Sequence, residues 1–196
     1  MRGLLLAVVA ITVLGCSQTA TPIVRQPTPA PSPTSAKPTP PPPRPTPTLS
    51  ASATLRDVAG ARVGTVTFTE TYAGILVVGD INGLGLGAHG IHIHEIGKCQ
   101  APFTSAGAHF NPGGKHHGFF NPDGPHLGDL PNIDTPAAGK LRFEFLMQGT
   151  TMIRGANAIL GANGAAIVIH GSRDNYRTDP AGDTGSRIAC GVIALK

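Results

Sequence analysis

The sequence lacks several features that define common classes of protein. No apolar run approaches the ~20 residues that a membrane-spanning helix needs, because the run at residues 4–14 is followed by Gly15 and Cys16. No segment shows the amphipathic spacing of a helix of about ten residues or more. Residues 51–196 also lack net charge, since four of the fifteen basic residues come earlier and eleven basic face eleven acidic side chains. A neutral domain offers no basic face, which argues against nucleic acid as a partner.

Residues 1–15 predict a secretory signal peptide, with Arg2, a short apolar core and small residues at its end. The run Val13-Leu14-Gly15-Cys16 resembles the bacterial lipobox, in which the cysteine becomes the lipid-modified first residue of the mature protein. The alternative is a plain secretion signal with a chance cysteine. A lipid on Cys16 would anchor the protein to a membrane without a transmembrane helix. We therefore expect export across the inner membrane and a lipid-anchored protein of the bacterial envelope or periplasm.

Residues 16–50 predict a disordered tether. Residues 21–50 hold twelve of the nineteen prolines, mixed with threonine, serine and alanine, so the stretch cannot bury enough apolar surface to fold. It is expected to extend as polyproline II. A ligand for a proline-recognising domain is the alternative, but a spacer directly after Cys16 explains the placement.

Residues 51–196 predict one all-β domain, a Greek-key sandwich or barrel. From Ser52 onward, short β-branched and alternating runs are separated by glycine turns. The expected strands are residues 64–69, 74–78, 90–94, 141–146, 166–170 and 187–193. Residues 97–139 and 171–186, rich in glycine, proline, asparagine and aspartate, are not expected to form strands. The first is long enough to indicate a functional loop, which metal ligation could order.

Cys99 and Cys190 remain as an even pair once Cys16 is assigned to the lipid anchor. In an oxidising compartment such a pair predicts a disulfide. It would close a long loop and contribute ~3 to 5 kcal/mol in the chain-entropy treatment.

Histidines are the most informative residues of the domain. His92 and His94 are two apart in an expected strand, so they project from one face while Ile91 and Ile93 face the core. A His-x-His pair alone is weak evidence for a metal site. Further ligands follow in the frame His109-x7-His117-x8-His126-x2-Asp129, which suits tetrahedral zinc in a closed structural site.

A second ion is predicted where His170, at the end of its strand, joins His92 and His94. If His109 serves both ions, this one has four imidazoles, a set that favours Cu(II). His89 and His116 are left over. Spacing alone cannot decide between the adjacent His116 and His117, and for His89 we expect a structural, hydrogen-bonded role.

Several separated blocks together resemble copper/zinc superoxide dismutase of the bacterial secreted lipoprotein type, over nearly all of residues 53–196. The blocks are Gly90-Ile91-His92-Ile93-His94-Glu95, Ala108-His109-Phe110-Asn111-Pro112, His126-Leu127-Gly128-Asp129-Leu130 and Gly185-Ser186-Arg187-Ile188-Ala189-Cys190-Gly191. The resemblance implies an eight-stranded Greek-key barrel that holds one copper and one zinc ion per subunit.

The resemblance also implies a role for each site residue. It implies copper on His92, His94, His109 and His170, and zinc on His109, His117, His126 and Asp129, with His109 bridging as an imidazolate. It places Arg187 beside the copper, Asp174 as a brace between His92 and His117, and Cys99–Cys190 as the disulfide that ties the long loop to the last strand.

The implied reaction is the dismutation of superoxide to dioxygen and hydrogen peroxide. His109 would carry one proton, and Arg187 would attract the anion, since a guanidinium stays charged at any working pH. One departure from the animal enzymes is Pro180, which stands seven residues before Arg187 where those enzymes have a guiding lysine. The cations considered as substitutes are Lys98, Lys115, Arg173 and Arg177, although each is more typical of an ordinary surface charge.

Two other functions compete with the enzyme. One is a non-catalytic copper/zinc-binding module on the same fold, because fold alone does not decide function. The other is an interaction protein whose stalk contacts the cell wall, which leaves seven ligands unexplained. The sequence retains all four copper histidines and Arg187, which favours the enzyme. A homodimer is left open.

Overall fold

The computed structural model describes residues 49–196. The predicted signal peptide, the lipidation of Cys16 and nearly all of the predicted tether lie outside the described residues. The first strand begins at Ser50, one residue before the predicted start of the domain. Among residues 49–196, no helix has the length and apolarity that crossing a membrane would require.

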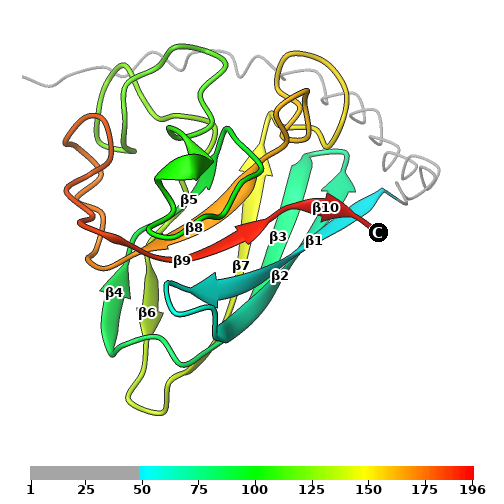
Figure 1. The fold of residues 1–196 in the computed structure, drawn as a ribbon. Helices are drawn as coiled ribbons and strands as arrows, with labels where there is room; N and C mark the ends of the chain where they lie inside the picture. Colours follow the sequence, from blue (N-terminus) through cyan, green and yellow to red (C-terminus); the bar gives the residue numbers. More distant parts are fainter. Residues whose placement is uncertain (1–48) are drawn as a thin grey trace, which may run out of the picture. The chain divides into compact units, whose positions relative to one another are not determined.

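The described part is almost entirely β structure joined by long loops (Figure 1). Its elements are β1 (Ser50–Asp57), β2 (Arg62–Thr71), β3 (Gly74–Asn82), β4 (Gly87–His89), β5 (Ile91–His94), the 3-10 turn η1 (Thr104–Ala106), β6 (Ile133–Thr135), β7 (Lys140–Gln148), β8 (Ala166–His170), β9 (Arg187–Val192) and β10 (Ala194–Leu195).

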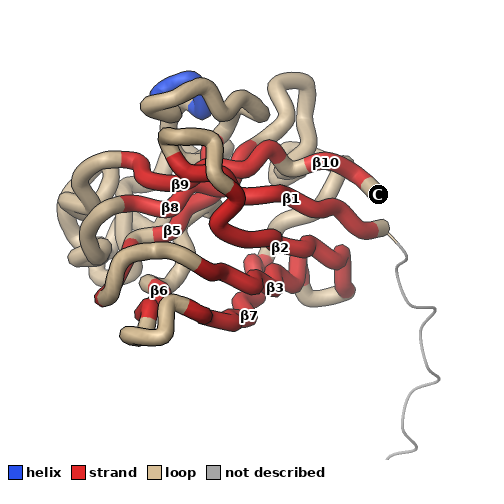
Figure 2. Tube along the Cα trace, turned by 60° about the horizontal axis from the view of Figure 1, so that its bottom comes forward, coloured by secondary structure: helices blue, strands red, loops and turns tan. Residues whose placement is uncertain are grey.

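The main sheet has the strand order β5-β8-β9-β1-β2-β3-β7, and all of its pairings are antiparallel. The short strand β10 pairs with β1 next to β9. The pair β4–β6 lies close to the two ends of this order, because one residue separates β4 from β5 and four residues separate β6 from β7. The sheet is strongly curled (Figure 2).

The core fills the inside of this curl. Ala51, Ala53 and Leu55 alternate inward along β1, as expected for a strand with one buried face. In β2 the alternation shifts, because the pairing slips between Leu55–Gly64 and Arg56–Arg62 and makes Val63 the extra residue of a bulge. Strand β8 is buried on both faces, since Ile167 and Ile169 join the main core and Val168 packs with Phe103 and Cys190.

The predicted all-β class and the six predicted strands are confirmed, with ends that differ by a few residues. One expectation was wrong: residues 97–139 were not expected to form strands, yet β6 lies within them. Within β6, Ile133 and Thr135 are buried and Asp134 is exposed between them. Three residues are too few for alternation to be recognised in a sequence, and tertiary pairing with Gly87–His89 creates the strand.

Candidate metal centre

Strand β5 is the base of the site. His92 and His94 project from one face and Ile91 and Ile93 from the other, as predicted, and all four side chains are fully buried. The long loop pairs along the free edge of β5: Ile93 N donates to Gly128 O, and Ile93 O accepts from Phe110 N. Gly128 is needed at this contact, because a Cβ there would lie too close to the Ile93 carbonyl and to Phe110. The loop therefore delivers His109 and Asp129 beside the strand.

Four histidines meet in one small volume: His92, His94, His109 and His170 each offer a ring nitrogen, and these nitrogens all lie within 4.8 Å of one another. Four buried nitrogens in this group have no hydrogen-bond partner, namely His92 Nδ1, His94 Nε2, His109 Nε2 and His170 Nε2. Buried polar atoms are normally paired, because leaving one unpaired costs roughly 1–3 kcal/mol. Four convergent imidazole lone pairs are the donor set expected for copper.

Each of these rings is oriented by its other nitrogen. His92 Nε2 donates to Asp174 Oδ2 at 2.9 Å, and His94 Nδ1 donates to the carbonyl oxygen of Gly107 at 3.0 Å. His170 Nδ1 lies 2.9 Å from the hydroxyl oxygen of Thr184. A second-shell bond to the far nitrogen sets the tautomer and leaves the near nitrogen free to ligate.

The zinc ligands predicted from the sequence also meet. His109 Nδ1, His117 Nδ1 and His126 Nδ1 lie 2.9, 3.1 and 3.3 Å from Asp129 Oδ1. His126 Nδ1 lies 3.4 Å from His109 Nδ1. Ligands about 2.0–2.1 Å from a tetrahedral ion are about 3.3–3.4 Å from one another. These four separations, from 2.9 to 3.4 Å, are at or slightly below that spacing.

The same condition, that every donor atom lies within 4.8 Å of every other, defines a second group. This group contains His92 rather than His126, together with His109, His117 and Asp129. The individual contacts favour His126. Its Nδ1 faces Asp129 and His109 directly, whereas His92 Nε2 is already bonded to Asp174. His126 therefore lies beside Asp129 and His109, and its place among the zinc ligands stays a prediction.

His109 lies between the two groups. Its Nδ1 faces Asp129, and its Nε2 is one of the unpartnered nitrogens that converge with those of His92, His94 and His170. The ring centroids of His109 and His92 are 4.0 Å apart, and those of His109 and His126 are 5.5 Å apart. One imidazole thus presents a nitrogen to each group.

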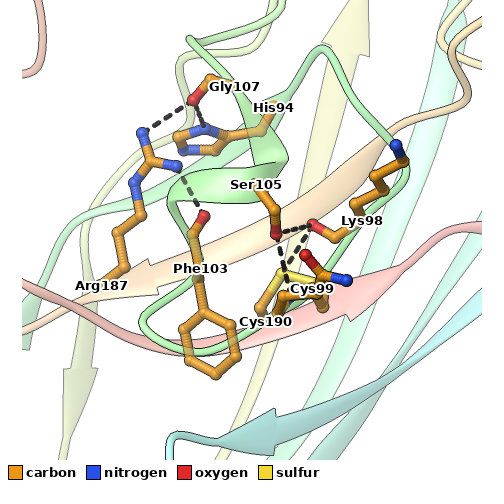
Figure 3. The surroundings of a disulfide bond; sticks show 9 residues. His94, Lys98, Cys99, Phe103, Ser105, Gly107, Arg187 and Cys190 are labelled. Atoms are coloured by element: carbon orange, nitrogen blue, oxygen red, sulfur yellow. Dashed lines mark hydrogen bonds between the residues drawn. A yellow bond between two sulfur atoms is a disulfide. The ribbon is translucent and has the colours of Figure 1, made fainter.

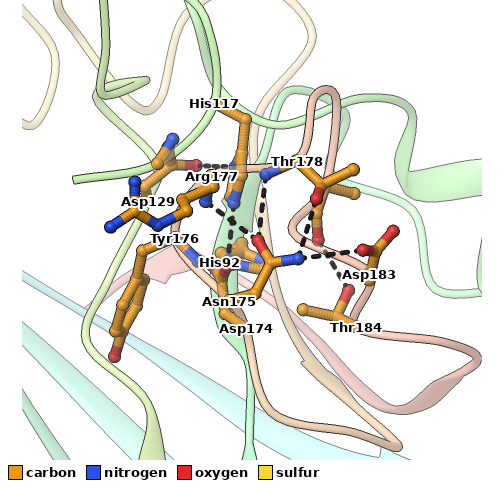
Figure 4. A network of polar contacts seen from close by, with 12 residues as sticks. His92, His117, Asp129, Asp174, Asn175, Tyr176, Arg177, Thr178, Asp183 and Thr184 are labelled. Carbon is orange, nitrogen blue, oxygen red and sulfur yellow. Dashed lines mark hydrogen bonds and ion pairs between the residues drawn. The ribbon is translucent and has the colours of Figure 1, made fainter. Parts of the chain in front are cut away.

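Asp174 joins the two groups from the outside. Its Oδ2 accepts from His92 Nε2 and its Oδ1 accepts from His117 Nε2 at 3.0 Å (Figure 4). Asp174 and both rings are almost completely buried. Gly182, with φ +69°, makes room for this bridge, because a Cβ there would overlap Asp174 Oδ1 and lie 2.7 Å from His117 Nε2.

Burial and the two carboxylates set the charge of the centre. Burial lowers the pKa of His94 to about 2, of His170 to about 3 and of His109 to about 4, against an ordinary value of 6.5. Burial also lowers the pKa of His92, despite its bond to Asp174. These rings are therefore neutral at neutral pH, which is the form that binds metal.

His117 differs from the other rings. Burial opposes its charged form, but hydrogen bonds to Asp129 and Asp174 outweigh burial and raise the pKa of His117 to about 9. Burial also opposes the charged form of both carboxylates. Hydrogen bonds from His109 and His117 nevertheless lower the pKa of Asp129, and those from His117 and His92 lower that of Asp174. Without metal, an imidazolium of His117 offsets part of the negative charge of these two carboxylates, a role that a divalent cation can take.

Arg187 extends from β9 toward His94, one of the four histidines that converge (His92, His94, His109 and His170, here called the copper-side rings) (Figure 3). Its Nη1 donates to Phe103 O at 2.8 Å and its Nη2 donates to Gly107 O at 2.7 Å. The same Gly107 carbonyl accepts from His94, so one peptide group holds both a predicted ligand and the cation. Phe103 has φ +73°, a left-handed conformation that directs its carbonyl toward Arg187.

The predicted disulfide between Cys99 and Cys190 is present, with Cα atoms 5.7 Å apart. It ties the loop that carries Phe103 and Gly107 to the strand that carries Arg187 (Figure 3). Phe103 packs with Cys99 and Cys190 in the smaller core cluster. The bridge therefore supports the peptide groups that hold the guanidinium.

The remaining candidates lie outside the two groups. His89 is buried and bonds the carbonyl oxygens of His170 and Gly85, as expected for a structural histidine. His116 is exposed and lies 3.1 Å from Asp179, so His117 is the one of the adjacent pair that faces inward. Arg177 lies over the ring of Phe120, with Cζ 4.9 Å from the centroid. Lys98, Lys115, Arg173 and Arg177 are all exposed.

The sequence analysis missed Thr184, Gly107, Phe103 and Gly182. Each acts through a backbone group, a hydroxyl or the absence of a side chain, and none is a residue type that signals metal binding. Gly182 lies in the Gly-rich loop 171–186, but no spacing rule connects it to Asp174 across the fold. Their roles could only be read from coordinates.

Comparison with known proteins gives one consistent family. Residues 62–193 match the model of the family described as copper/zinc superoxide dismutase. The chain is 44% identical over 137 residues to "Superoxide dismutase [Cu-Zn] 1" of Aquifex aeolicus, which covers 68% of this chain and 81% of that protein. It resembles the crystal structure of a SOD-like protein from Bacillus subtilis (TM-score 0.71, 37% identity, 73% and 97% of the two chains). It also resembles Cu/Zn superoxide dismutase from Brucella abortus (TM-score 0.58, 29% identity, 74% and 99%).

Proposed function

The chain belongs to the copper/zinc superoxide dismutase family, and from that premise we propose that it converts superoxide to dioxygen and hydrogen peroxide. Two superoxide anions and two protons yield one molecule of each product. Copper and zinc are the cofactors of the family, and the two groups of donor atoms suit them. The observation that carries the proposal is the convergence of four unpartnered buried imidazole nitrogens, one of them on a ring that also faces a zinc-like set.

Copper would be held by His92, His94, His109 and His170, and zinc by His109, His117, His126 and Asp129. When bound, copper supplies the redox chemistry by alternating between Cu(II) and Cu(I), while zinc is redox-inert and supplies charge and geometry. The bridging role of His109 is supported by its two differently engaged nitrogens. The neutral rings on the copper side are already in the ligating form.

The chain's own residues position the substrate and the proton. Arg187 offers a guanidinium whose orientation is set by two carbonyl bonds, which suits a small anion beside the copper-side rings. His109 Nε2 is the atom we assign to proton transfer, because Nδ1 is engaged on the zinc side. Burial of the rings excludes bulk water from the ligands, so proton delivery depends on such fixed groups.

We further propose that the protein is exported and lipid-anchored through Cys16 in the bacterial envelope. The run Val13-Leu14-Gly15-Cys16 after an apolar segment supports the anchor. The Cys99–Cys190 disulfide supports an oxidising compartment, because such bridges are rare in the cytosol of mesophiles. Metabolic labelling with a radioactive fatty acid, compared between the parent and Cys16→Ser, tests the anchor. A homodimer stays a prediction that analytical ultracentrifugation would test.

The function is tested by metal content and superoxide-dependent activity of the parent and of His170→Ala, with His116→Ala as control. We expect about one copper and one zinc per chain in the parent, and loss of copper and activity only in His170→Ala. His116 is exposed and outside both groups, so its variant should match the parent. A parent that binds both metals without activity would favour the alternative of a non-catalytic metal-binding module.

A further inference from the structure

Thr184 is a buried threonine three residues before Arg187, and only 2% of its surface is exposed. Its hydroxyl oxygen lies 2.9 Å from His170 Nδ1 and 2.9 Å from the carbonyl oxygen of Ala181. Its backbone is held as well, since Thr184 O accepts from Ser172 N. Its methyl group packs near Gly90, where an added Cβ would lie 2.5 Å from Thr184 Cγ2. The hydroxyl therefore has little freedom to turn away from the ring.

The number of protons determines how this contact works. A threonine hydroxyl has one proton to donate, and the carbonyl of Ala181 can only accept it. The hydroxyl oxygen must then accept from His170, so the ring carries its proton on Nδ1. His170 Nε2 is left with a free lone pair, and it is one of the four unpartnered nitrogens. The hydroxyl thus acts on both the tautomer and the orientation of the ring, beside the Gly185 carbonyl.

The same loop also reaches the other copper-side ring. Two residues earlier, Gly182 leaves the space in which Asp174 pairs with His92 and His117. Figure 4 shows Thr184 on the loop beside Asp183, close to the network of Asp174 and Asn175. Residues 181–184 therefore support His170 through the Thr184 hydroxyl, and they leave the space in which Asp174 bonds His92.

We propose that Thr184 is a positioning residue that holds His170 in the copper-binding tautomer and orientation, an inference that rests on the proposed copper site. Two other rings are oriented by stronger acceptors: His92 donates to a carboxylate and His94 donates to a carbonyl. Burial lowers the pKa of His170, and a hydrogen bond with the carbonyl of Gly185 partly opposes this effect. The contact of His170 Nδ1 with the Thr184 hydroxyl oxygen, at 2.9 Å, has hydrogen-bonding geometry.

The test compares copper binding by full-length zinc-loaded parent, Thr184→Val and Thr184→Ser. Valine keeps the shape and removes the hydroxyl, whereas serine keeps the hydroxyl. We expect Thr184→Val to bind Cu(II) roughly 10-fold or more weakly in chelator competition, with altered hyperfine splitting in its electron paramagnetic resonance spectrum. Thr184→Ser should restore both readouts toward those of the parent.

Thr135→Val is the matched control. Thr135 is also 2% exposed, but its buried hydroxyl has no hydrogen-bond partner, so copper affinity and spectrum should not change. Parent-like affinity and spectrum in Thr184→Val would overturn the inference and show that Gly185 suffices. Equal weakening in the valine and serine variants would also overturn it, since packing rather than the hydroxyl would then matter. A parent that binds no copper would refute the proposed function itself, and this inference with it.

Discussion

One carboxylate oxygen of Asp174 accepts a hydrogen bond from Nε2 of His117 at 3.0 Å, while the other oxygen of Asp174 accepts from His92. The two rings belong to different groups of donor atoms. Asp174 contributes no atom to either group, yet it orients one ring of each. A carboxylate in this place couples the geometry of the two groups of donor atoms without contributing a donor to either.

The first prediction concerns Asp174→Asn. An asparagine offers one oxygen and one NH2 group, so it can accept from only one of His92 and His117, and its NH2 group opposes the other ring's N–H. We expect affinity for at least one of the two metals to fall by 10–100-fold. Chelator competition with the purified protein measures both affinities.

Asp183→Asn is the control for that change. Asp183 lies on the same loop and is exposed, and its carboxylate accepts from Asn175. It should bind both metals like the parent. If Asp174→Asn also retains parent-like affinity for both ions, the coupling described above is wrong.

The second prediction concerns Gly182→Ala against Gly60→Ala. Both glycines have positive φ, +69° and +86°, so both variants incur the strain of a left-handed alanine. A Cβ at Gly182 would also overlap Asp174, whereas nothing lies within 4 Å of a Cβ at Gly60. We expect Gly182→Ala alone to lose zinc and copper affinity. Equal losses of stability and metal in both variants would show that strain, not the overlap, is responsible.

The third prediction concerns the disulfide. Cys99→Ser together with Cys190→Ser should lower the free energy of unfolding by about 2–5 kcal/mol, measured by urea denaturation of the metal-loaded protein. The loop that carries Phe103 and Gly107 would also be less well held against Arg187. We therefore expect a loss of superoxide-dependent activity larger than the loss of copper. Full activity at full copper loading would contradict this account of Arg187.

The fourth prediction concerns the metal-free protein at different pH values. His94, His109 and His170 have folded-state pKa values of about 2, 4 and 3, below the ordinary 6.5, so the unfolded chain binds more protons and stability falls as pH decreases from about 6.5. His117 has a raised pKa of about 9, so its contribution is complete below pH 6.5 and is lost as pH rises through 9. Stability should therefore be greatest near pH 6.5.

Urea unfolding after removal of metal by a chelator, at intervals from pH 4 to about pH 10, measures this profile. His117→Gln should abolish the decline on the alkaline side, because glutamine does not titrate. Zinc should also flatten that side, since it replaces the proton of His117. A metal-free protein more stable at pH 5 than at pH 6.5 would be inconsistent with buried neutral histidines.

The strands could be predicted where their own residues carry the signal. The β-branched runs of β2, β3 and β8 read as strands because alternate residues bury one face, or because the whole run is buried. Strand β6 could not be predicted, since its three residues gain their conformation from pairing with β4. The ligand set could be predicted because histidine and aspartate are the residue types that bind these metals, and their order matched a known family.

The positions that hold those ligands in place could not be predicted in the same way. Thr184, Gly107 and Gly182 are ordinary residue types, and they act on partners at least eight residues away in the chain. Their importance depends on where a hydroxyl, a carbonyl or an open space lies after folding. The sequence contains these residues but gives no local pattern that connects them to a ring.

The sequence by itself determined the all-β class, the pair of cysteines and the chemical identity of the donor groups, because these follow from local alternation and from side-chain chemistry. Only the tertiary structure decided that His109 presents one nitrogen to each group and that His117 rather than His116 faces inward. It also decided which acceptor orients each ring. Those outcomes depend on hydrogen bonds between segments as much as 82 residues apart, such as His92 and Asp174, whose distances no linear spacing encodes.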